Sequence, residues 1–232
     1  MRTGLLVAGL LVAAATLQFA YPAIATAGCP SCYGFVDAGD RVFIERGTTP
    51  DRRAQIRTVI AEAQDRVRGF YGSLDARPRI LICATQDCYE WFGGRSRGVA
   101  VLDWVLVLSP RGTDAVIAAH ELAHIELHSR VGLLGTLTRA VPQWFDEGLA
   151  VVVSDDPRYL TSDAREDRCR VEPDGAMPSS RAAWIESAES AGLYAKAACR
   201  VSRWLHGHGG REAVLRTIAA LARAADFEQA VR

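Results

Sequence analysis

The sequence predicts an α+β fold, with a small mixed sheet in the first half of the chain and mostly helices in the second. Strand-like runs rich in Val, Ile and Leu occur between residues 41 and 108, and Gly, Pro and Asp occupy the segments between them. From residue 113 onward the apolar residues recur at helical spacing instead. Strand and helix patterns that are separated along the chain in this way are typical of α+β domains.

The predicted strands are interrupted by one helix. Residues 41–45 alternate like a short strand, and residues 50–71 carry apolar side chains at a helical period. Residues 79–84 form a second strand-like run, and residues 98–108 form a longer one that is dense in Val, Leu and Trp. We expect these three strand segments to share one small sheet.

The next element is a very apolar helix. Thr113 or Asp114 can cap its N-terminus, and we expect it to run to about Ser129, with Gly132 beyond its end. Nearly every side of this helix is apolar, which is typical of a buried central helix. The few polar side chains on it therefore require partners.

The rest of the chain is predicted to be helical, with one irregular segment. A connection of about a dozen residues leads to Pro142, which opens a helix that runs to Val153. Residues 155–180 are rich in Asp, Arg, Pro and Ser and predict an irregular surface segment. Three more helical stretches are expected near residues 180–189, 193–206 and 211–223.

The first residues have the pattern of a secretory signal peptide. Arg2 supplies a positive charge, Leu5 to Phe19 is an uncharged apolar run, and Ala25-Thr26-Ala27 is a small-residue cleavage site. We expect cleavage before Gly28, because the apolar run is short and is followed by Pro22, which disfavours a membrane span. The chain is therefore predicted to be exported.

This pattern predicts a signal peptide over residues 1–27 and one domain over residues 28–232. The sheet-containing part of that domain covers about 36–130, and the helical part about 140–232. The alternative is a lipoprotein, in which Thr26-Ala27-Gly28-Cys29 is a lipobox and the attached lipid is the only expected membrane contact.

The charge and the cysteines narrow the class of protein. The chain has 27 basic and 27 acidic residues, so its net charge gives no reason to expect a nucleic-acid partner. Six cysteines in an exported chain indicate disulfide bonds, and many pairings are open. A zinc–thiolate site at Cys29-Pro-Ser-Cys32 is disfavoured, because a second such pair at zinc-ribbon spacing is lacking. The pairings that we favour are Cys29–Cys32, Cys83–Cys88 and Cys169–Cys199.

The segment His120-Glu121-Leu122-Ala123-His124 lies in the middle of the buried helix. Histidines four residues apart project from one face, close enough for both imidazoles to reach one zinc ion. Glu121 points roughly 100° around the helix, so it does not join the ligand row but can act as a base toward a water in an open metal position. The alternative is that the three groups only satisfy one another in the core.

A catalytic zinc needs a third protein ligand, and its position distinguishes families. The metzincin pattern requires glycine and histidine where this sequence has Leu127 and Arg130. Downstream, the segment from Pro142 to Ala150 places Glu147 in the first turns of the next helix, which can pack antiparallel to the first. Glu147 is therefore the candidate third ligand.

These motifs resemble those of the gluzincin zinc metallopeptidases, and within them the short exported bacterial proteins of the peptidase MA-like family. The shared motifs are His-Glu-x-x-His and, downstream, Trp-Phe-x-Glu-Gly-Leu-Ala. The resemblance implies that Zn²⁺ is bound by His120, His124 and Glu147. It implies that Glu121 is the general base. It also implies a thermolysin-like zincin fold, with the sheet over the zinc-binding helix and residues 98–108 as the edge strand beside an extended substrate.

The resemblance extends to the related zinc aminopeptidases around Tyr194. It implies that the Tyr194 hydroxyl donates a hydrogen bond to the oxyanion, and the alternative is a tyrosine that only packs its ring. Those aminopeptidases also carry a glutamate in the edge-strand motif to hold a free N-terminus. Residues 98–102 contain no glutamate, so exopeptidase activity is not expected.

The resemblance does not assign the aspartate that orients a ligand histidine, nor a role for His128. Thermolysin-type sites have an aspartate four residues after the third ligand to orient a histidine, but that position is Val151 here. Asp146, Asp155 and Asp103 are the candidates for this role. His128 extends the histidine row by another four residues and could touch substrate or a second metal, but we favour a simple interaction with the helix dipole near the C-terminus of its helix.

The sequence therefore predicts a zinc-dependent peptide-bond hydrolase in the periplasm or outside the cell. Its substrate would be a peptide, an unfolded exported protein or a cell-wall peptide cross-link. The alternative is a catalytically silent zinc-binding structural or adaptor protein of the cell envelope. Glu121 argues against that alternative, because a structural zinc site needs no general base.

Overall fold

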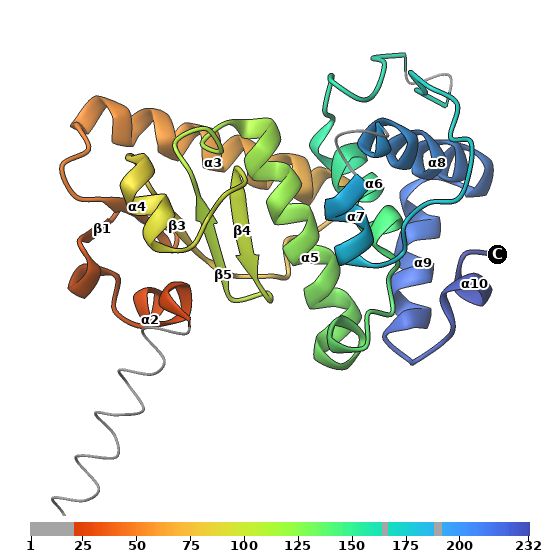
Figure 1. The fold of residues 1–232 in the computed structure, drawn as a ribbon, viewed down its shortest axis with the longest axis horizontal. Helices are drawn as coiled ribbons and strands as arrows, with labels where there is room; N and C mark the ends of the chain where they lie inside the picture. The colour runs from red at the N-terminus through yellow and green to blue at the C-terminus, as the bar shows by residue number, and fades with distance from the viewer. Residues whose placement is uncertain (1–20, 164–166, 188–191) are drawn as a thin grey trace, which may run out of the picture. The chain divides into compact units, whose positions relative to one another are not determined.

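The computed structural model describes residues 21–163, 167–187 and 192–232, and it confirms the α+β class (Figure 1). The predicted signal peptide falls mostly on residues 1–20, which lie outside the described residues. Within the described ranges, no helix combines the length and the apolar character needed to cross a membrane.

The chain divides into two compact units. The sheet unit comprises Met1–Thr58 and Arg77–Thr113, and the helical unit comprises Val59–Ala76 and Asp114–Arg232. Helix α3 (Pro50–Tyr71) begins in the sheet unit and ends in the helical unit, with the bounds that the apolar periodicity predicts.

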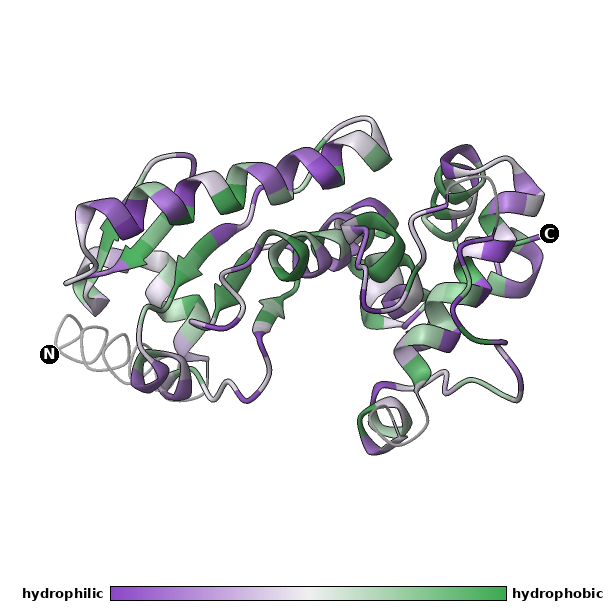
Figure 2. Cartoon of the chain, turned by 90° about the horizontal axis from the view of Figure 1, so that it is seen from above, coloured by the Kyte–Doolittle hydropathy of each residue, from purple (hydrophilic) through white to green (hydrophobic). Residues whose placement is uncertain are grey.

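The described part of the sheet unit contains one five-stranded mixed sheet with the strand order β1-β2-β3-β5-β4. β2, β3 and β5 are parallel neighbours, and β1 and β4 are antiparallel edge strands. Figure 2 shows the strands as largely hydrophobic, in keeping with their place in the core of this unit. The strands are Phe35–Asp37 (β1), Val42–Glu45 (β2), Arg79–Ile82 (β3), Gly98–Val101 (β4) and Val105–Leu108 (β5).

The single long strand predicted over residues 98–108 is wrong, because this segment is a hairpin of β4 and β5. Between the two strands Leu102 takes a φ of 52°, and the Trp104 N–H donates to the Val101 carbonyl oxygen at 3.2 Å. Asp103 is the only residue in the turn with a clear turn preference, so the apolar composition hides the turn. The edge strand is therefore β4, whereas β5 lies inside the sheet and is buried at every residue.

Short helices that the sequence did not predict complete the sheet unit. One of them, α2, contains the expected cleavage site, and its Ala23 and Ala27 pack in a core cluster with buried sheet residues. Cleavage before Gly28 would remove most of this helix from the mature protein. The short helices are Pro22–Gly28 (α2), the 3-10 helix Pro30–Tyr33 and Gln86–Trp91 (α4).

All six cysteines are paired, and the pairs are the three that the sequence favoured. Two disulfides lie within the sheet unit and one within the helical unit. Three disulfides are typical of proteins from an oxidising compartment outside the cytoplasm.

The helical unit is built around α6, which packs against both α5 and α8. Close packing on α8 depends on Gly148, because a Cβ atom there would lie 2.5 Å from the Ala197 carbonyl oxygen. The helices of this unit are Ala115–Leu137 (α5), Gln143–Ser154 (α6), Arg181–Ser187 (α7), Leu193–His208 (α8), Arg211–Leu221 (α9) and Phe227–Ala230 (α10).

Helix α5 begins as predicted but continues further. Asp114 caps it by accepting hydrogen bonds from the backbone N–H groups of Val116 and Ile117. The first helical segment ends at Gly132, where φ is 85°, as the sequence predicts, and a second short segment continues to Leu137. The connection of about a dozen residues to Pro142 therefore contains a helical segment that the sequence did not predict.

A buried carboxylate fixes α5 to the segment that follows α3 within the helical unit. Glu126 is fully buried and accepts from the backbone N–H groups of Asp75 and Ala76 at 2.9 Å each. Arg130 donates from Nε to Glu126 at 2.7 Å. We call these four residues the Glu126 clamp. It fixes the part of α5 that directly follows the His-Glu-x-x-His segment.

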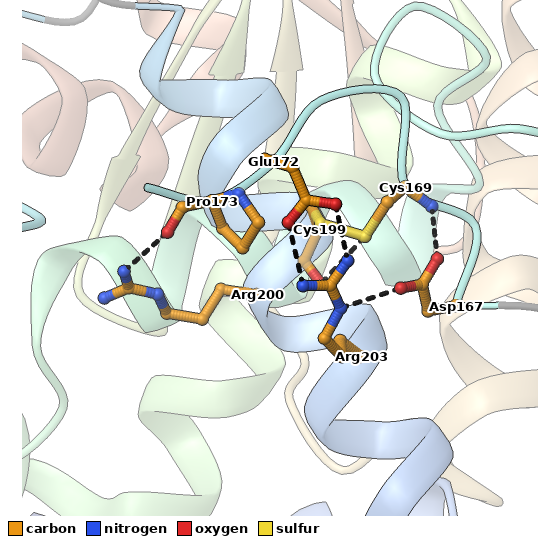
Figure 3. The surroundings of a disulfide bond; sticks show 7 residues. All are labelled: Asp167, Cys169, Glu172, Pro173, Cys199, Arg200 and Arg203. Atoms are coloured by element: carbon orange, nitrogen blue, oxygen red, sulfur yellow. Dashed lines mark hydrogen bonds and ion pairs between the residues drawn. A yellow bond between two sulfur atoms is a disulfide. The ribbon is translucent and has the colours of Figure 1, made fainter. Parts of the chain in front are cut away.

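The segment predicted to be irregular, residues 155–180, contains no helix or regular strand among its described residues. It is attached to α8 by the Cys169–Cys199 disulfide (Figure 3). Beside this bond Arg203 of α8 forms ion pairs with Asp167 and Glu172, as Figure 3 shows.

Candidate metal centre

Helices α5 and α6 bring His120, His124 and Glu147 together. The Nε2 atoms of His120 and His124 lie 3.1 Å apart. Glu147 Oε2 lies 3.3 Å from the first of these nitrogens and 3.6 Å from the second. Ligands held tetrahedrally about 2.0–2.1 Å from one ion would be about 3.3 Å apart. The three atoms form such a triangle, so this group could hold a metal ion.

We call His120, His124 and Glu147 the ligand triangle. Their side chains are mostly buried but keep some contact with solvent. The side chains of His120 and His124 are each 13% exposed and that of Glu147 is 11% exposed. Gln143, one turn earlier on α6, donates from Nε2 to Glu147 Oε1 at 2.9 Å. This bond occupies one carboxylate oxygen and leaves Oε2 directed toward the histidines. The sequence reasoning missed Gln143, although its position four residues before Glu147 was a usable signal.

The charges of the triangle complement one another. Burial alone would raise the pKa of Glu147, but hydrogen bonds and charges of His120 and His124 lower it to about 2. Burial would lower the pKa of His124, but Asp146 and Glu147 outweigh it and raise the pKa well above its usual value. Glu147 is therefore ionised at neutral pH, and the two carboxylates beside His124 favour its protonated ring in the metal-free protein.

Asp146 is the aspartate that orients a histidine of the triangle. Its Oδ1 atom accepts from His124 Nδ1 at 2.5 Å, and its side chain is only 9% exposed. A proton on Nδ1 leaves the Nε2 lone pair of His124 free to face a metal ion. Of the three aspartates considered, Asp155 instead pairs with Arg168, and Asp103 lies in the hairpin turn of the sheet unit.

The structure gives His128 a partner that the sequence did not predict. Its Nε2 atom is 2.7 Å from Asp146 Oδ2. As predicted, His128 lies near a helix end, in the last turn before Gly132, whose non-helical φ of 85° separates two helical segments of α5. The contact with Asp146 depends on how α6 packs on α5, so the spacing of residues within α5 could not predict it.

Glu121 lies beside the triangle and is partly buried. Among the described residues its carboxylate has no hydrogen-bond or ion-pair partner. This is unlike Glu126 on the same helix, which accepts several hydrogen bonds. The carboxylate oxygens of Glu121 are therefore open to water or to a bound molecule.

Tyr194 of α8 lies near the first ligand. Its ring centroid is 6.4 Å from that of His120, and it stacks on Tyr159 at 5.5 Å and contacts the Trp184 ring edge-on at 5.2 Å. Burial, followed by the negative charge of Glu147, raises the pKa of Tyr194 to about 12. Its hydroxyl therefore stays protonated at neutral pH and can act as a donor.

The fold and the site define a disulfide-bonded α+β protein with a candidate His–His–Glu metal centre. Compared with protein-family models, curated proteins and solved structures, the chain has no significant match.

Proposed function

We propose that the chain is an exported, zinc-dependent peptide-bond hydrolase of the gluzincin type, with a thermolysin-like zincin fold. The observation that carries the proposal is the ligand triangle, whose edges of 3.1, 3.3 and 3.6 Å match those of a tetrahedral zinc site. The order of the motif supports it, since α5 supplies both histidines and α6 supplies the carboxylate.

The donor set favours zinc. Two imidazole nitrogens and one carboxylate oxygen suit Zn²⁺, and three protein ligands are typical of catalytic rather than structural zinc. A bound zinc ion would polarise a scissile carbonyl and lower the pKa of a water molecule to about 7.

The side chains around the triangle provide the remaining roles. Glu121, without a partner among the described residues, can accept the proton of the attacking water and deliver it to the leaving amine. Tyr194, whose pKa is raised to about 12 by burial, can donate its hydroxyl proton to the developing oxyanion. A peptide, an unfolded exported protein or a cell-wall peptide cross-link is the proposed substrate.

The first experiment measures zinc content and hydrolysis of a mixed peptide library. It compares the purified protein with the Glu121→Gln variant and with Glu186→Gln, which changes an exposed glutamate of α7. We expect about one zinc per chain in all three proteins, and loss of hydrolysis by about 10²- to 10⁴-fold only in Glu121→Gln.

The other outcomes select the alternatives. Zinc in all three proteins without hydrolysis in any would favour the structural or adaptor role in the cell envelope. Lack of zinc in the unmodified protein would mean that the two histidines and Glu147 only satisfy one another.

The role of Tyr194 is tested separately by Tyr194→Phe. This change keeps the ring that packs on Tyr159 and removes the hydroxyl. We expect hydrolysis to fall by about 10²-fold, with zinc content unchanged, because one oxyanion donor is lost. Unchanged hydrolysis would leave Tyr194 with a packing role only.

A further inference from the structure

One buried carboxylate holds two histidines of α5. Asp146 Oδ1 accepts from His124 Nδ1 at 2.5 Å, and Asp146 Oδ2 accepts from His128 Nε2 at 2.7 Å. Only His124 of these two belongs to the ligand triangle. Any effect of His128 on the triangle therefore passes through Asp146.

We propose that His128 is a positioning residue of the metal centre, which fixes the Asp146 carboxylate so that this carboxylate in turn fixes the ring of His124. This inference rests on the proposed metal centre.

The geometry explains why one donor would not suffice. The carboxylate of an aspartate rotates readily about its last torsion, so a single hydrogen bond to one oxygen leaves its plane poorly defined. Here His124 and His128 lie one turn apart on the same helix and each donates to a different oxygen. Two donors on one rigid element define the carboxylate plane.

Burial makes the second donor necessary. The Asp146 side chain is only 9% exposed, so water has little access to Oδ2. A buried carboxylate oxygen without a donor is unfavourable and drives rearrangement. If His128 were lost, Asp146 would reorient toward another donor, and the His124 ring would lose its fixed orientation.

A second metal ion at His128 has no comparable support. Within the described ranges, the only group of three or more candidate ligands is His120, His124 and Glu147. His128 and Asp146 would supply only two metal ligands, which falls short of the three protein ligands of a zinc site.

The test compares zinc affinity in three variants by competition with a chromophoric chelator. His128→Phe removes the donor and keeps a ring, whereas His128→Gln retains an N–H group that can reach Asp146. His206→Phe is the matched control, because His206 is exposed on α8. We expect His128→Phe to weaken zinc binding on the order of tenfold, His128→Gln to restore most of it, and His206→Phe to change nothing.

A spectroscopic readout separates positioning from general loosening of the fold. In the Co²⁺-substituted proteins we expect the visible absorption bands to shift in His128→Phe and to return toward their original position in His128→Gln. Thermal melting of the metal-free variants reports whether each one folds. If His128→Phe does not fold, the comparison of His128→Gln with His128→Ala takes its place.

A double variant tests whether His128 acts through Asp146. In the Asp146→Asn background, His128→Phe should add little further loss of zinc affinity, because the carboxylate it positions is gone. Independent, additive losses would overturn the inference. So would unchanged zinc affinity in a folded His128→Phe variant.

The failure of this inference and the failure of the proposed function have different signatures. If the unmodified protein binds no zinc, both are wrong. If it binds zinc but hydrolyses no peptide, the hydrolase proposal fails, while the role of His128 is still decided by the affinities of the variants.

Discussion

Two glutamates on α5 occupy opposite chemical situations. Glu126 is fully buried, and its carboxylate accepts hydrogen bonds from two backbone N–H groups and from Arg130. Glu121 is partly buried and has no partner within the ranges that the structure describes. Both charges sit on a very apolar helix, but only the first is fully satisfied. The Glu126 clamp therefore serves stability, whereas the partly exposed Glu121, next to the ligand His120 in the chain, keeps its carboxylate open to water or a bound molecule.

The largest expected effect comes from exchanging the two glutamates for alanine. Glu126→Ala leaves the N–H groups of Asp75 and Ala76 without their acceptor, and we expect the free energy of unfolding to fall by about 3–5 kcal/mol. Glu121→Ala should change it by only about 0.5 kcal/mol, because no partner is lost. Urea unfolding of the metal-free proteins measures both. Equal losses in the two variants would contradict the division of roles.

A smaller effect is expected on the α6 side of the candidate metal centre. A methyl group in Gly148→Ala would lie 2.5 Å from the Ala197 carbonyl oxygen, so α6 would have to move away from α8. We expect a loss of about 1–3 kcal/mol of stability. Zinc affinity should fall as well, because the neighbouring Glu147 moves with the helix.

Gly207→Ala on α8 is the matched control for this change. Nothing lies within 4 Å of a Cβ atom at Gly207, so the same substitution should stabilise the helix by up to about 1 kcal/mol. If both alanine variants gained stability, the close approach of α6 and α8 would not be a constraint on the metal centre.

The sequence predicted the features that depend on residues close together in the chain. The period of apolar residues gave the bounds of α3, and the capping preference of Asp114 gave the start of α5. The spacing of His120 and His124 predicted a shared face, because a helix brings residues four apart together. The structure places their ring nitrogens 3.1 Å apart.

The sequence did not predict the turn and the side-chain contacts that depend on the three-dimensional packing. The turn between β4 and β5 rests on Leu102, which rarely adopts a positive φ, and no composition rule predicts it. The contact between His128 and Asp146 depends on how α6 packs on α5, and the bond from Gln143 to Glu147 depends on rotamers. The first contact requires the relative position of two helices, which a single sequence does not specify, whereas the second lies within α6, where the four-residue spacing permits the bond without fixing the rotamers that form it.

The smallest expected effect is on the pH dependence of stability at Glu147. Unlike Glu126, Glu147 has its charge stabilised by histidines rather than by backbone N–H groups. Its pKa is lowered from 4.5 to about 2, so ionised Glu147 stabilises the folded, metal-free protein. Because the folded pKa is the lower one, this contribution is fully present above pH 4.5 and is lost as the pH falls toward 2.

The free energy of unfolding of Glu147→Gln should therefore fall less steeply between pH 4.5 and 2 than that of the unmodified protein or of Glu186→Gln, as measured by urea unfolding after chelator treatment.

The pKa of His124 is shifted in the opposite direction, so its contribution to stability has the opposite dependence on pH. Its raised pKa contributes stability that is present below its usual value and is lost as the pH rises through the folded value. Zinc binding needs the unprotonated ring, so zinc affinity should increase over that same rise in pH. A zinc affinity that does not change with pH would show that no proton on His124 competes with the metal.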